Sequence, residues 1–193
     1  MNPLLKAYRS IKDQKEKYYK KWICKQFKHV GEGTVINKIE NLSHPERISL
    51  GNQVYVGNHC VLEAITQSRN QVFHPEITIG DGTRLGDYCH LGAVEFIHIG
   101  KNVLTGRFIL VNDHSHGTIQ DLGQKVAPFK RPLVSKGGIT IGDNVWLGDK
   151  VSILSGVTIG EGAIIGANSV VTKDVPAHSF AAGCPAKVIK TAE

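Results

Sequence analysis

The chain has 193 residues, a formal net charge of +6, 41% hydrophobic and 7% aromatic residues, and 21 glycines. This length suits one domain with a small appendage, and frequent Gly with few aromatics suits a chain that turns often around a thin core. Residues 1–30 hold nine Lys or Arg and two acids, a net charge of +7, so the remaining 163 residues carry −1. That nearly neutral remainder argues against nucleic-acid binding by the main domain.

The N-terminal segment, residues 1–29, is predicted to be a basic amphipathic helix. Its apolar residues recur mostly at helical spacing: Leu4, Leu5, Tyr8, Ile11, Tyr18, Trp22 and Ile23. No apolar stretch has the length of a membrane span or a signal peptide, so we expect a cytoplasmic protein. Two interpretations of the helix stay open. It packs on its own domain or a neighbouring subunit, or residues 1–28 contact the inner face of an anionic membrane.

A six-residue repeat begins after Val30. Aliphatic residues recur at a spacing of six at Ile141, Leu147, Ile153, Ile159, Ile165 and Val171. The same step links earlier sets, with the weakest residues last: Leu50, Val56 and Leu62; Ile79, Leu85 and Leu91; Thr105 and Val111. Each unit makes one short strand and one turn, where Gly142 and Gly148 are expected to supply backbone conformations that a side chain would resist. Three units close a coil of about 18 residues, so we predict an all-β parallel β-helix over residues 30–190.

The repeat is interrupted at residues 63–76 and, for 27 residues, at 112–138. Long loops in compact domains are usually functional, so the segment 112–138 is predicted to protrude and to carry chemistry. It opens with Asn112-Asp113-His114-Ser115-His116. A neutral His is the usual base near neutral pH, and a neighbouring carboxylate such as Asp113 can fix its tautomer. The residues alone are equally compatible with an ordinary loop histidine.

The stretch NDHSHG, followed by KGGITIGDNVWLGDKVSILSGVTIGEGAIIGANSVV and GCPAKVIK, resembles the hexapeptide-repeat acyltransferase superfamily. Within it, the segment is similar to the galactoside and maltose acetyltransferases and, more closely, to the capsule and lipopolysaccharide O-acetyltransferases. The resemblance implies a left-handed β-helix, a homotrimer with active sites between subunits, and acetyl-CoA as co-substrate with no metal required. It implies that His114 is the catalytic base, with Asp113 beside it and His116 as the fallback.

The resemblance also implies residues that bind the two substrates. The acceptor-side residues are Asn112, His116 and Trp146, of which Trp146 should point outward because it precedes an inward Leu147. The coenzyme-side positions are Asp149, Ala167, Thr172, Lys173, Lys187 and Lys190. Lys187 and Lys190 stand where the galactoside enzymes carry Arg, so we expect phosphate attraction without a bidentate contact, although each lysine could be a solvated surface charge. Residues 183–190 are expected to form a short C-terminal helix.

These features predict an acetyl-CoA-dependent O-acetyltransferase acting on a hydroxyl of a sugar or polysaccharide precursor. A backbone N–H between Trp146 and Gly148 is expected to hold the oxyanion. Alternatives within acyl transfer are N-acetylation of an amino sugar and O-acetylation of serine. Two other classes stay open: a zinc enzyme similar to the γ-type carbonic anhydrases, using His90, His98, His114 or His116, and a non-catalytic β-helix scaffold.

Overall fold

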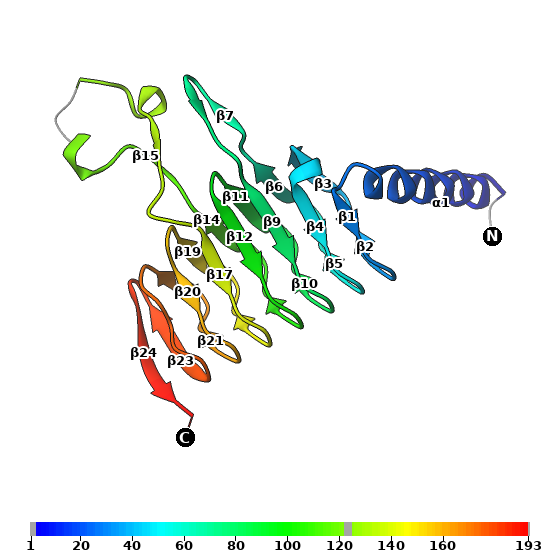
Figure 1. The fold of residues 1–193 in the computed structure, drawn as a ribbon. Helices are drawn as coiled ribbons and strands as arrows, with labels where there is room; N and C mark the ends of the chain where they lie inside the picture. The colour runs from blue at the N-terminus through cyan, green and yellow to red at the C-terminus, as the bar shows by residue number, and fades with distance from the viewer. Residues whose placement is uncertain (1–2, 122–124, 193) are drawn as a thin grey trace.

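The computed structural model describes residues 3–121 and 125–192, and its body is a parallel β-helix with three flat faces (Figure 1). Sheet A contains β1 (His29–Val30), β4 (Ile48–Leu50), β9 (Glu76–Ile79), β12 (Phe96–Ile99), β17 (Ile139–Ile141) and β20 (Thr158–Ile159). Sheet B contains β2 (Val35–Ile36), β5 (Tyr55–Val56), β10 (Arg84–Leu85), β13 (Leu104–Thr105), β18 (Trp146–Leu147), β21 (Ile164–Ile165), β23 (Ser179–Gly183) and β24 (Ala186–Thr191). Sheet C contains β3 (Ile39–Ser43), β6 (Cys60–Ala64), β11 (His90–Ala93), β14 (Leu110–Asn112), β19 (Ser152–Leu154) and β22 (Val170–Val171).

The core is the stack of inward residues that the six-residue spacing predicts. Every residue of that spacing is at most 6% exposed, Thr105 included. The parallel register places equivalent side chains directly above one another, as in the column Leu50, Ile79, Ile99, Ile141 and Ile159. Full burial of such a side chain contributes about 1.5–3 kcal/mol, and each coil supplies the surface that buries the next.

The corner glycines are required for a different reason from the one expected. The positive φ angles fall on residues that follow the glycines, such as Asn144 (58°) and Lys150 (60°), and not on Gly142 or Gly148. A Cβ atom on Gly142 would instead lie 2.7 Å from the backbone nitrogen of Glu161 in the next coil. The expectation that Gly142 and Gly148 supply unusual backbone conformations is therefore wrong, because close approach of successive coils is what excludes a side chain there.

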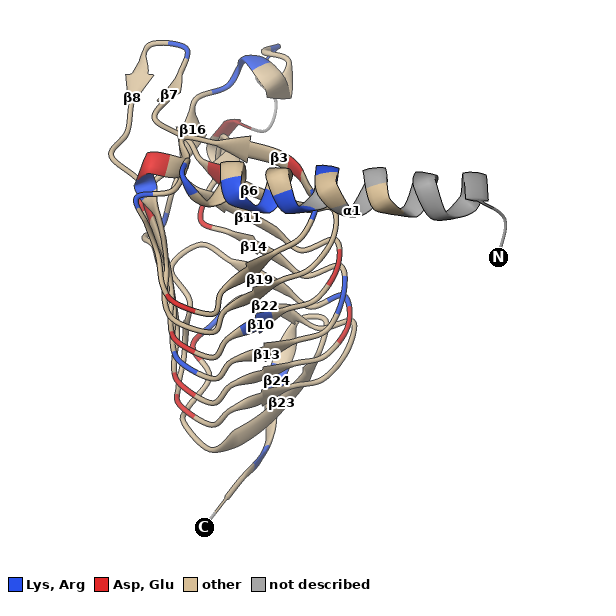
Figure 2. Cartoon of the chain, turned by 90° about the vertical axis from the view of Figure 1, so that its right-hand side faces the viewer, with Lys and Arg blue, Asp and Glu red and all other residues tan. Residues whose placement is uncertain are grey.

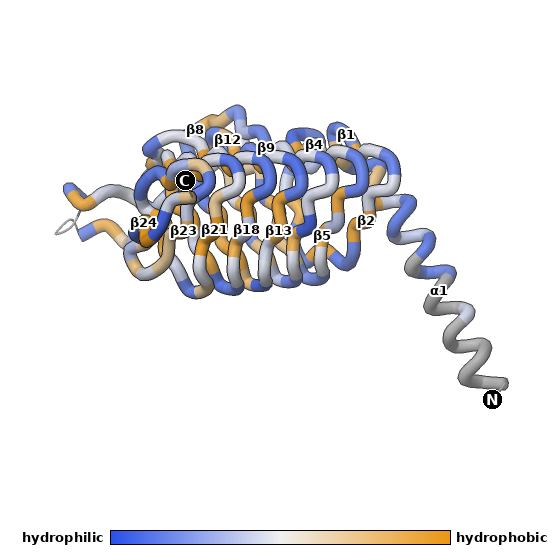
Figure 3. Tube along the Cα trace, turned by 90° about the horizontal axis from the view of Figure 1, so that it is seen from below, coloured by the Kyte–Doolittle hydropathy of each residue, from blue (hydrophilic) through white to orange (hydrophobic). Residues whose placement is uncertain are grey.

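Helix α1 (Pro3–Cys24) confirms the predicted N-terminal helix, and the described side chains at its C-terminal end pack on the body (Figures 1 and 3). Ile23 is 2% exposed, the following Phe27 is 7% exposed, and the Tyr19 hydroxyl accepts a hydrogen bond from the Ile39 backbone N–H at 3.0 Å. The expected apolar side chains nearer its start, Leu4, Leu5, Tyr8 and Ile11, lie outside the described side chains. Within the described residues, no helix has the length and apolar character needed to cross a membrane.

The predicted short C-terminal helix is wrong. Residues 186–191 form strand β24, which pairs antiparallel with β23 through Lys187↔Ala182 and Lys190↔Phe180. Cys184 and Pro185 form the tight turn after Gly183, which has a φ of +107°, and the β-branched Val188 and Ile189 favour an extended backbone. The open edge of sheet B also offers backbone partners to this strand that an isolated helix would lack.

Both interruptions of the repeat emerge on the same side of the molecule (Figures 1 and 2). The first holds the antiparallel hairpin β7 (Gln67–Ser68) and β8 (Gln71–Val72). The second protrudes, as predicted, and pairs β15 (Ser115–His116) with β16 (Leu133–Val134). Its remaining described segments include the short helices η2 (Ile119–Asp121) and η3 (Pro128–Lys130). Another short helix, η1 (Pro45–Arg47), precedes β4.

Candidate active site

Asp113 and His114 form a hydrogen-bonded pair at the end of β14. Asn112 pairs with Gly92, so Asp113 follows at the level where the coils below place Ala93 and Ala64. The Asp113 carboxylate is fully buried, and it accepts hydrogen bonds from the backbone N–H groups of Val94 and Glu95, both at 2.8 Å. These bonds replace the water that a buried carboxylate loses, and they fasten the start of the loop to the next turn of the coil.

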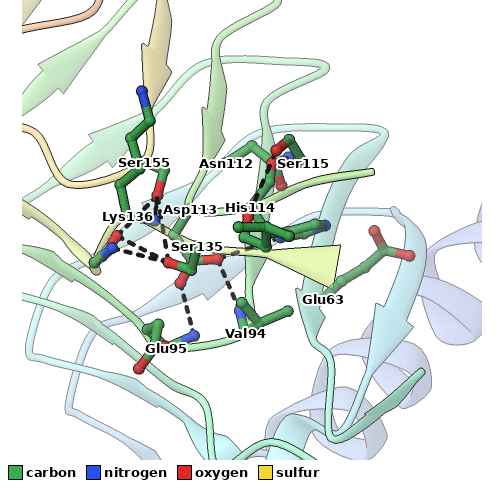
Figure 4. Close-up of polar contacts among 12 residues, drawn as sticks. Glu63, Val94, Glu95, Asn112, Asp113, His114, Ser115, Ser135, Lys136 and Ser155 are labelled. Atoms are coloured by element: carbon green, nitrogen blue, oxygen red, sulfur yellow. Dashed lines mark hydrogen bonds and ion pairs between the residues drawn. The ribbon is translucent and has the colours of Figure 1, made fainter. Parts of the chain in front are cut away.

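The His114 ring is oriented by the same carboxylate. Its Nδ1 lies 3.2 Å from Asp113 Oδ1, and its side chain is only 10% exposed (Figure 4). A carboxylate only accepts hydrogen bonds, so in the neutral ring Nδ1 carries the hydrogen and Nε2 holds the lone pair. The Asn112 amide donates to the His114 carbonyl at 2.8 Å and holds the turn behind the ring. The arrangement can therefore take a proton at Nε2 from a group bound beside it.

His114 lines a pocket of about 400 Å³, which we call the histidine pocket. Its lining combines sheet C with both interruptions: Glu63, Ile65, Gln67, Ser68, His90, Asn112, His114, His116 and Leu133. The predicted residues Asn112, His114 and His116 thus lie together. Glu63 was not predicted, and it bonds His90 across the coils at 3.0 Å (His90 Nε2 to Oε2). The signal for it was the coil register, which pairs Glu63 with Gly92 and so brings it beside Asn112.

The far end of the loop is fastened as firmly as its start. The backbone N–H of Lys136 donates to the Ser155 hydroxyl at 2.6 Å, and the Ser135 and Ser155 hydroxyls lie 3.3 Å apart (Figure 4). Ser155 directly follows β19, so the loop returns to the coil that stacks on β14. The histidine is consequently presented from a loop whose two ends are both bonded to the rigid body.

Trp146 lies on a different face, in a second pocket of about 400 Å³ that we call the tryptophan pocket. It is lined by Gly106, Trp146, Gly148, Asp149, Ile164, Ile165, Gly166, Ala167 and Phe180. Trp146 points outward from sheet B, as predicted, and is 50% exposed. The structure therefore brings Trp146 together with the predicted coenzyme residues Asp149 and Ala167, and not with His114 of the same chain.

The tryptophan pocket has a charged corner. The Asp149 carboxylate accepts a hydrogen bond from the Arg107 backbone N–H at 2.8 Å, and this bond, followed by the Arg107 guanidinium, holds the pKa of Asp149 below its usual range. The expected oxyanion donors are not available, because the N–H groups of Trp146 and Gly148 already donate to Ala163 and Ile165 at 2.9 and 2.8 Å. That expectation is wrong for these two N–H groups.

The four other predicted coenzyme residues are divided between two places. Lys190 pairs with Phe180 and Lys187 with Ala182, so both exposed lysines lie on the strand beside the tryptophan pocket. Thr172 and Lys173 follow β22 at the next corner of the coil, outside the residues that line that pocket. Among the residues that the structure describes, no three His, Cys, Asp or Glu side chains converge as metal ligands.

Comparisons with known proteins agree with this architecture. The bacterial transferase hexapeptide family (six repeats) matches residues 138–173. The chain is 35% identical over 118 residues to the putative lipopolysaccharide biosynthesis O-acetyl transferase WbbJ of Escherichia coli K12, an alignment that covers 59% of this chain and 60% of that protein. The chain thus spans less than two thirds of that relative's length.

Two solved structures share the fold. The hexapeptide-repeat acetyltransferase VCA0836 from Vibrio cholerae, complexed with acetyl-coenzyme A, superposes with a TM-score of 0.60 at 26% identity, covering 88% of this chain and 74% of that one. The N-acyltransferase AntD from Bacillus cereus superposes with a TM-score of 0.72 at 21% identity, covering 90% and 87%. The predicted resemblance to the hexapeptide-repeat acyltransferases and the predicted left-handed parallel β-helix are therefore confirmed.

Proposed function

We propose that this protein is an acetyl-CoA-dependent O-acetyltransferase that acts on a hydroxyl of a sugar or polysaccharide precursor. The observation that carries the proposal is the buried Asp113 carboxylate, which orients His114 with Nε2 available to the histidine pocket. The likeness to an O-acetyl transferase of lipopolysaccharide biosynthesis and to an acetyl-CoA-bound neighbour supports the acyl donor and the sugar-related acceptor.

In the proposed reaction, the acceptor hydroxyl donates a hydrogen bond to His114 Nε2 in the histidine pocket. His114 removes the proton as the hydroxyl oxygen attacks the thioester carbonyl of acetyl-CoA. The tetrahedral intermediate then collapses, the acetyl–oxygen bond is retained, and the thiolate of CoA leaves with the proton returned from the imidazolium. Such a base contributes roughly 10²–10⁴-fold to the rate, and holding both substrates together contributes the larger share.

The coenzyme is proposed to occupy the tryptophan pocket of a neighbouring subunit. The two pockets share no lining residue, so one chain presents the base and the coenzyme groove on separate faces. The outer face of sheet B carries an exposed apolar column, with Leu104, Trp146, Ile164 and Phe180 between 37% and 50% exposed and in register. A homotrimer that covers this face would bring a histidine pocket of one subunit to a tryptophan pocket of the next.

The coenzyme phosphates are proposed to lie near Lys187 and Lys190 in this assembly, because both lysines flank the groove. Thr172 and Lys173 lie outside the tryptophan pocket, so they are proposed to contact only the part of the coenzyme that extends beyond it. Lysine provides a point charge and three rotatable donors, which suits a flexible pyrophosphate without imposing a fork geometry.

The acceptor panel is the direct test of this function. Acetyl-CoA is incubated with methyl glycosides of glucose, galactose and N-acetylglucosamine, with glucosamine, and with serine, while free CoA thiol and product mass are followed. The proposal expects thiol release matched by an ester product on a glycoside. Acetylation of glucosamine nitrogen alone would favour the N-acetyltransferase alternative, and the absence of both transfer and CoA binding would favour a scaffold.

A membrane contact through residues 1–28 is the remaining part of the proposal. The charge of residues 1–30 and the exposure of Tyr18 (76%) and Trp22 (56%) support it. Substitution of exposed Lys15, Lys17 and Lys21 by Gln leaves Ile23 and Phe27 in the core, so the β-helix is kept. The variant should co-sediment less than the parent with phosphatidylserine vesicles, and equal binding would contradict this part.

A further inference from the structure

The two interruptions of the repeat are joined by one side chain. The Gln71 amide in β8 donates from Nε2 to the Leu133 carbonyl at 3.0 Å, and its Oε1 accepts from the Leu133 backbone N–H at 2.7 Å. Gln71 and Leu133 are 62 residues apart in the sequence. A side-chain amide that bonds both the N–H and the C=O of one residue reproduces the pairing of a neighbouring strand.

Leu133 depends on this partner because of its position in the two-stranded ribbon that β15 and β16 form. Strand β16 pairs with β15 through His116↔Leu133 and Ser115↔Val134, and next to it the Gly117 N–H donates to the Pro132 carbonyl at 2.9 Å. The N–H and C=O of Leu133 face Gln71, on the edge of β16 away from β15, and Leu133 is only 6% exposed. A buried polar group left without a partner destabilises the fold, so Gln71 stabilises this edge.

The same contact lies close to the proposed base. His116 is opposite Leu133 in the ribbon, and His114 precedes it by two residues. The loop is fastened at its start by Asp113 and at its end by Ser155, and Gln71 fastens the ribbon between them. At the hairpin tip, the Arg69 guanidinium carbon lies 5.9 Å from the Phe129 ring centroid and adds a second, weaker contact.

The interruption that carries Gln71 also forms part of the histidine pocket. Ile65, Gln67 and Ser68 line the cavity opposite the loop residues, so they face any group held beside His114. Gln67 and Ser68 offer uncharged donors and acceptors, which suit the hydroxyls of a polyol.

We propose that Gln71 is a positioning residue for the histidine loop and that Ile65, Gln67 and Ser68 form the acceptor-selecting wall of the histidine pocket. The acceptor class is an uncharged polyol whose neighbouring hydroxyls bond Gln67 and Ser68. The kinetic part of this inference rests on the proposed function. The contact between Gln71 and Leu133, which we call the clamp, is tested without any activity.

Hydrogen exchange tests the clamp without any substrate. In Gln71→Ala, the amides of Leu133 and Val134 should exchange at least about ten-fold faster than in the parent, since the edge loses its partner. The core amide of Ile141 should exchange at the same rate in Gln71→Ala as in the parent. Gln26→Ala, which removes a half-buried glutamine that donates to the Trp22 carbonyl and does not line the histidine pocket, is the matched control. Unchanged exchange at Leu133 in Gln71→Ala would overturn the clamp, whatever the activity.

Kinetics with the best methyl glycoside of the acceptor panel test the two roles separately. Gln71→Ala should lower kcat by about ten-fold and leave the KM for acetyl-CoA unchanged, because a displaced base slows the chemical step. Gln67→Ala should raise the KM for the glycoside several-fold with kcat close to the parent, because it removes binding of the acceptor. A rise in the KM for acetyl-CoA of Gln71→Ala as large as its fall in kcat would overturn the first assignment. An unchanged KM for the glycoside in Gln67→Ala would overturn the second.

Gln71→Glu provides a conservative rescue. The carboxylate retains the acceptor for the Leu133 N–H but opposes the Leu133 carbonyl, whereas the protonated acid restores the donor. Facing a carbonyl raises a carboxyl pKa, so the activity of this variant relative to the parent should rise from about pH 8 to about pH 5.5. A flat ratio would contradict the clamp's role in catalysis. Lack of transfer by the parent to every acceptor would instead count against the proposed function, and hydrogen exchange would still decide the clamp.

Discussion

The histidine pocket and the tryptophan pocket each enclose about 400 Å³, but they arise from different parts of the chain. The tryptophan pocket is made almost entirely by the regular coil, where Trp146, Ile164 and Phe180 follow one another in register on sheet B. The histidine pocket exists because two loops leave the coil and meet above sheet C. One pocket is therefore repetitive and apolar, and the other is irregular and polar.

The difference has a physical basis. A repeating coil can offer a long groove of backbone groups and small residues, which suits an extended ligand such as the pantetheine arm of CoA. Its inward positions hold mainly apolar side chains, so titratable groups are confined to its outward positions. Asp113 shows what departure from the repeat permits: at a level where earlier coils have alanine, its buried carboxylate orients His114. Chemistry is consequently expected where the period fails, and coenzyme binding where it persists.

The largest effect is expected from a substitution that disrupts only the histidine pocket. His114→Ala should lower kcat by roughly 10²–10⁴-fold, because it removes the base, while the KM for acetyl-CoA stays close to the parent value. Steady-state assays with the best acceptor check both constants. His116→Ala serves as the control for the fallback assignment, and a larger loss in that variant than in His114→Ala would exchange their roles.

The next effect breaks the tryptophan pocket alone. Ala167→Trp places a large ring in the groove at an exposed corner, so the KM for acetyl-CoA should rise by about ten-fold or more with little loss of stability. Calorimetric titration with CoA measures the same loss directly. Unchanged CoA affinity in a folded Ala167→Trp protein would move the coenzyme away from this groove.

A smaller effect concerns the lysines beside the groove. The double substitution Lys187→Gln and Lys190→Gln should raise the KM for acetyl-CoA by about three- to ten-fold, and this penalty should shrink at high salt, because the phosphate contacts are solvent-exposed and screened. Dephospho-CoA is the matched ligand, because it carries fewer phosphate charges and the double substitution should therefore weaken its binding less. The same penalty for both ligands at every salt concentration would argue against a phosphate contact.

The sequence predicted the coil well because its signal is redundant. Fourteen positions at a spacing of six all proved to be buried, and each repeats the same physical requirement. The sequence also predicted that Asn112, Asp113, His114 and His116 lie together, since they are adjacent in the chain. Glu63, His90 and Gln71 lie near these residues because of the coil register or a long-range contact, and no local sequence pattern predicts either.

The C-terminus illustrates the opposite failure. Residues 183–190 were expected to be helical, but the open edge of sheet B gave β24 backbone partners that local propensity does not include. The corner glycines were correctly located but explained by the wrong cause, because the contact that excludes a Cβ comes from the next coil.

The central claim is that an active site joins the histidine pocket of one subunit to the tryptophan pocket of another, and mixing two inactive variants tests it most directly. His114→Ala and Ala167→Trp are co-expressed with different affinity tags, mixed oligomers are purified through both tags, and acetyl transfer to the best acceptor is measured. Each protein alone should be nearly inactive. A trimer that contains both variants should regain about a third of the parental activity per subunit, because one of its three interfaces pairs two intact halves. Mixed oligomers that stay as inactive as the single variants would contradict the claim.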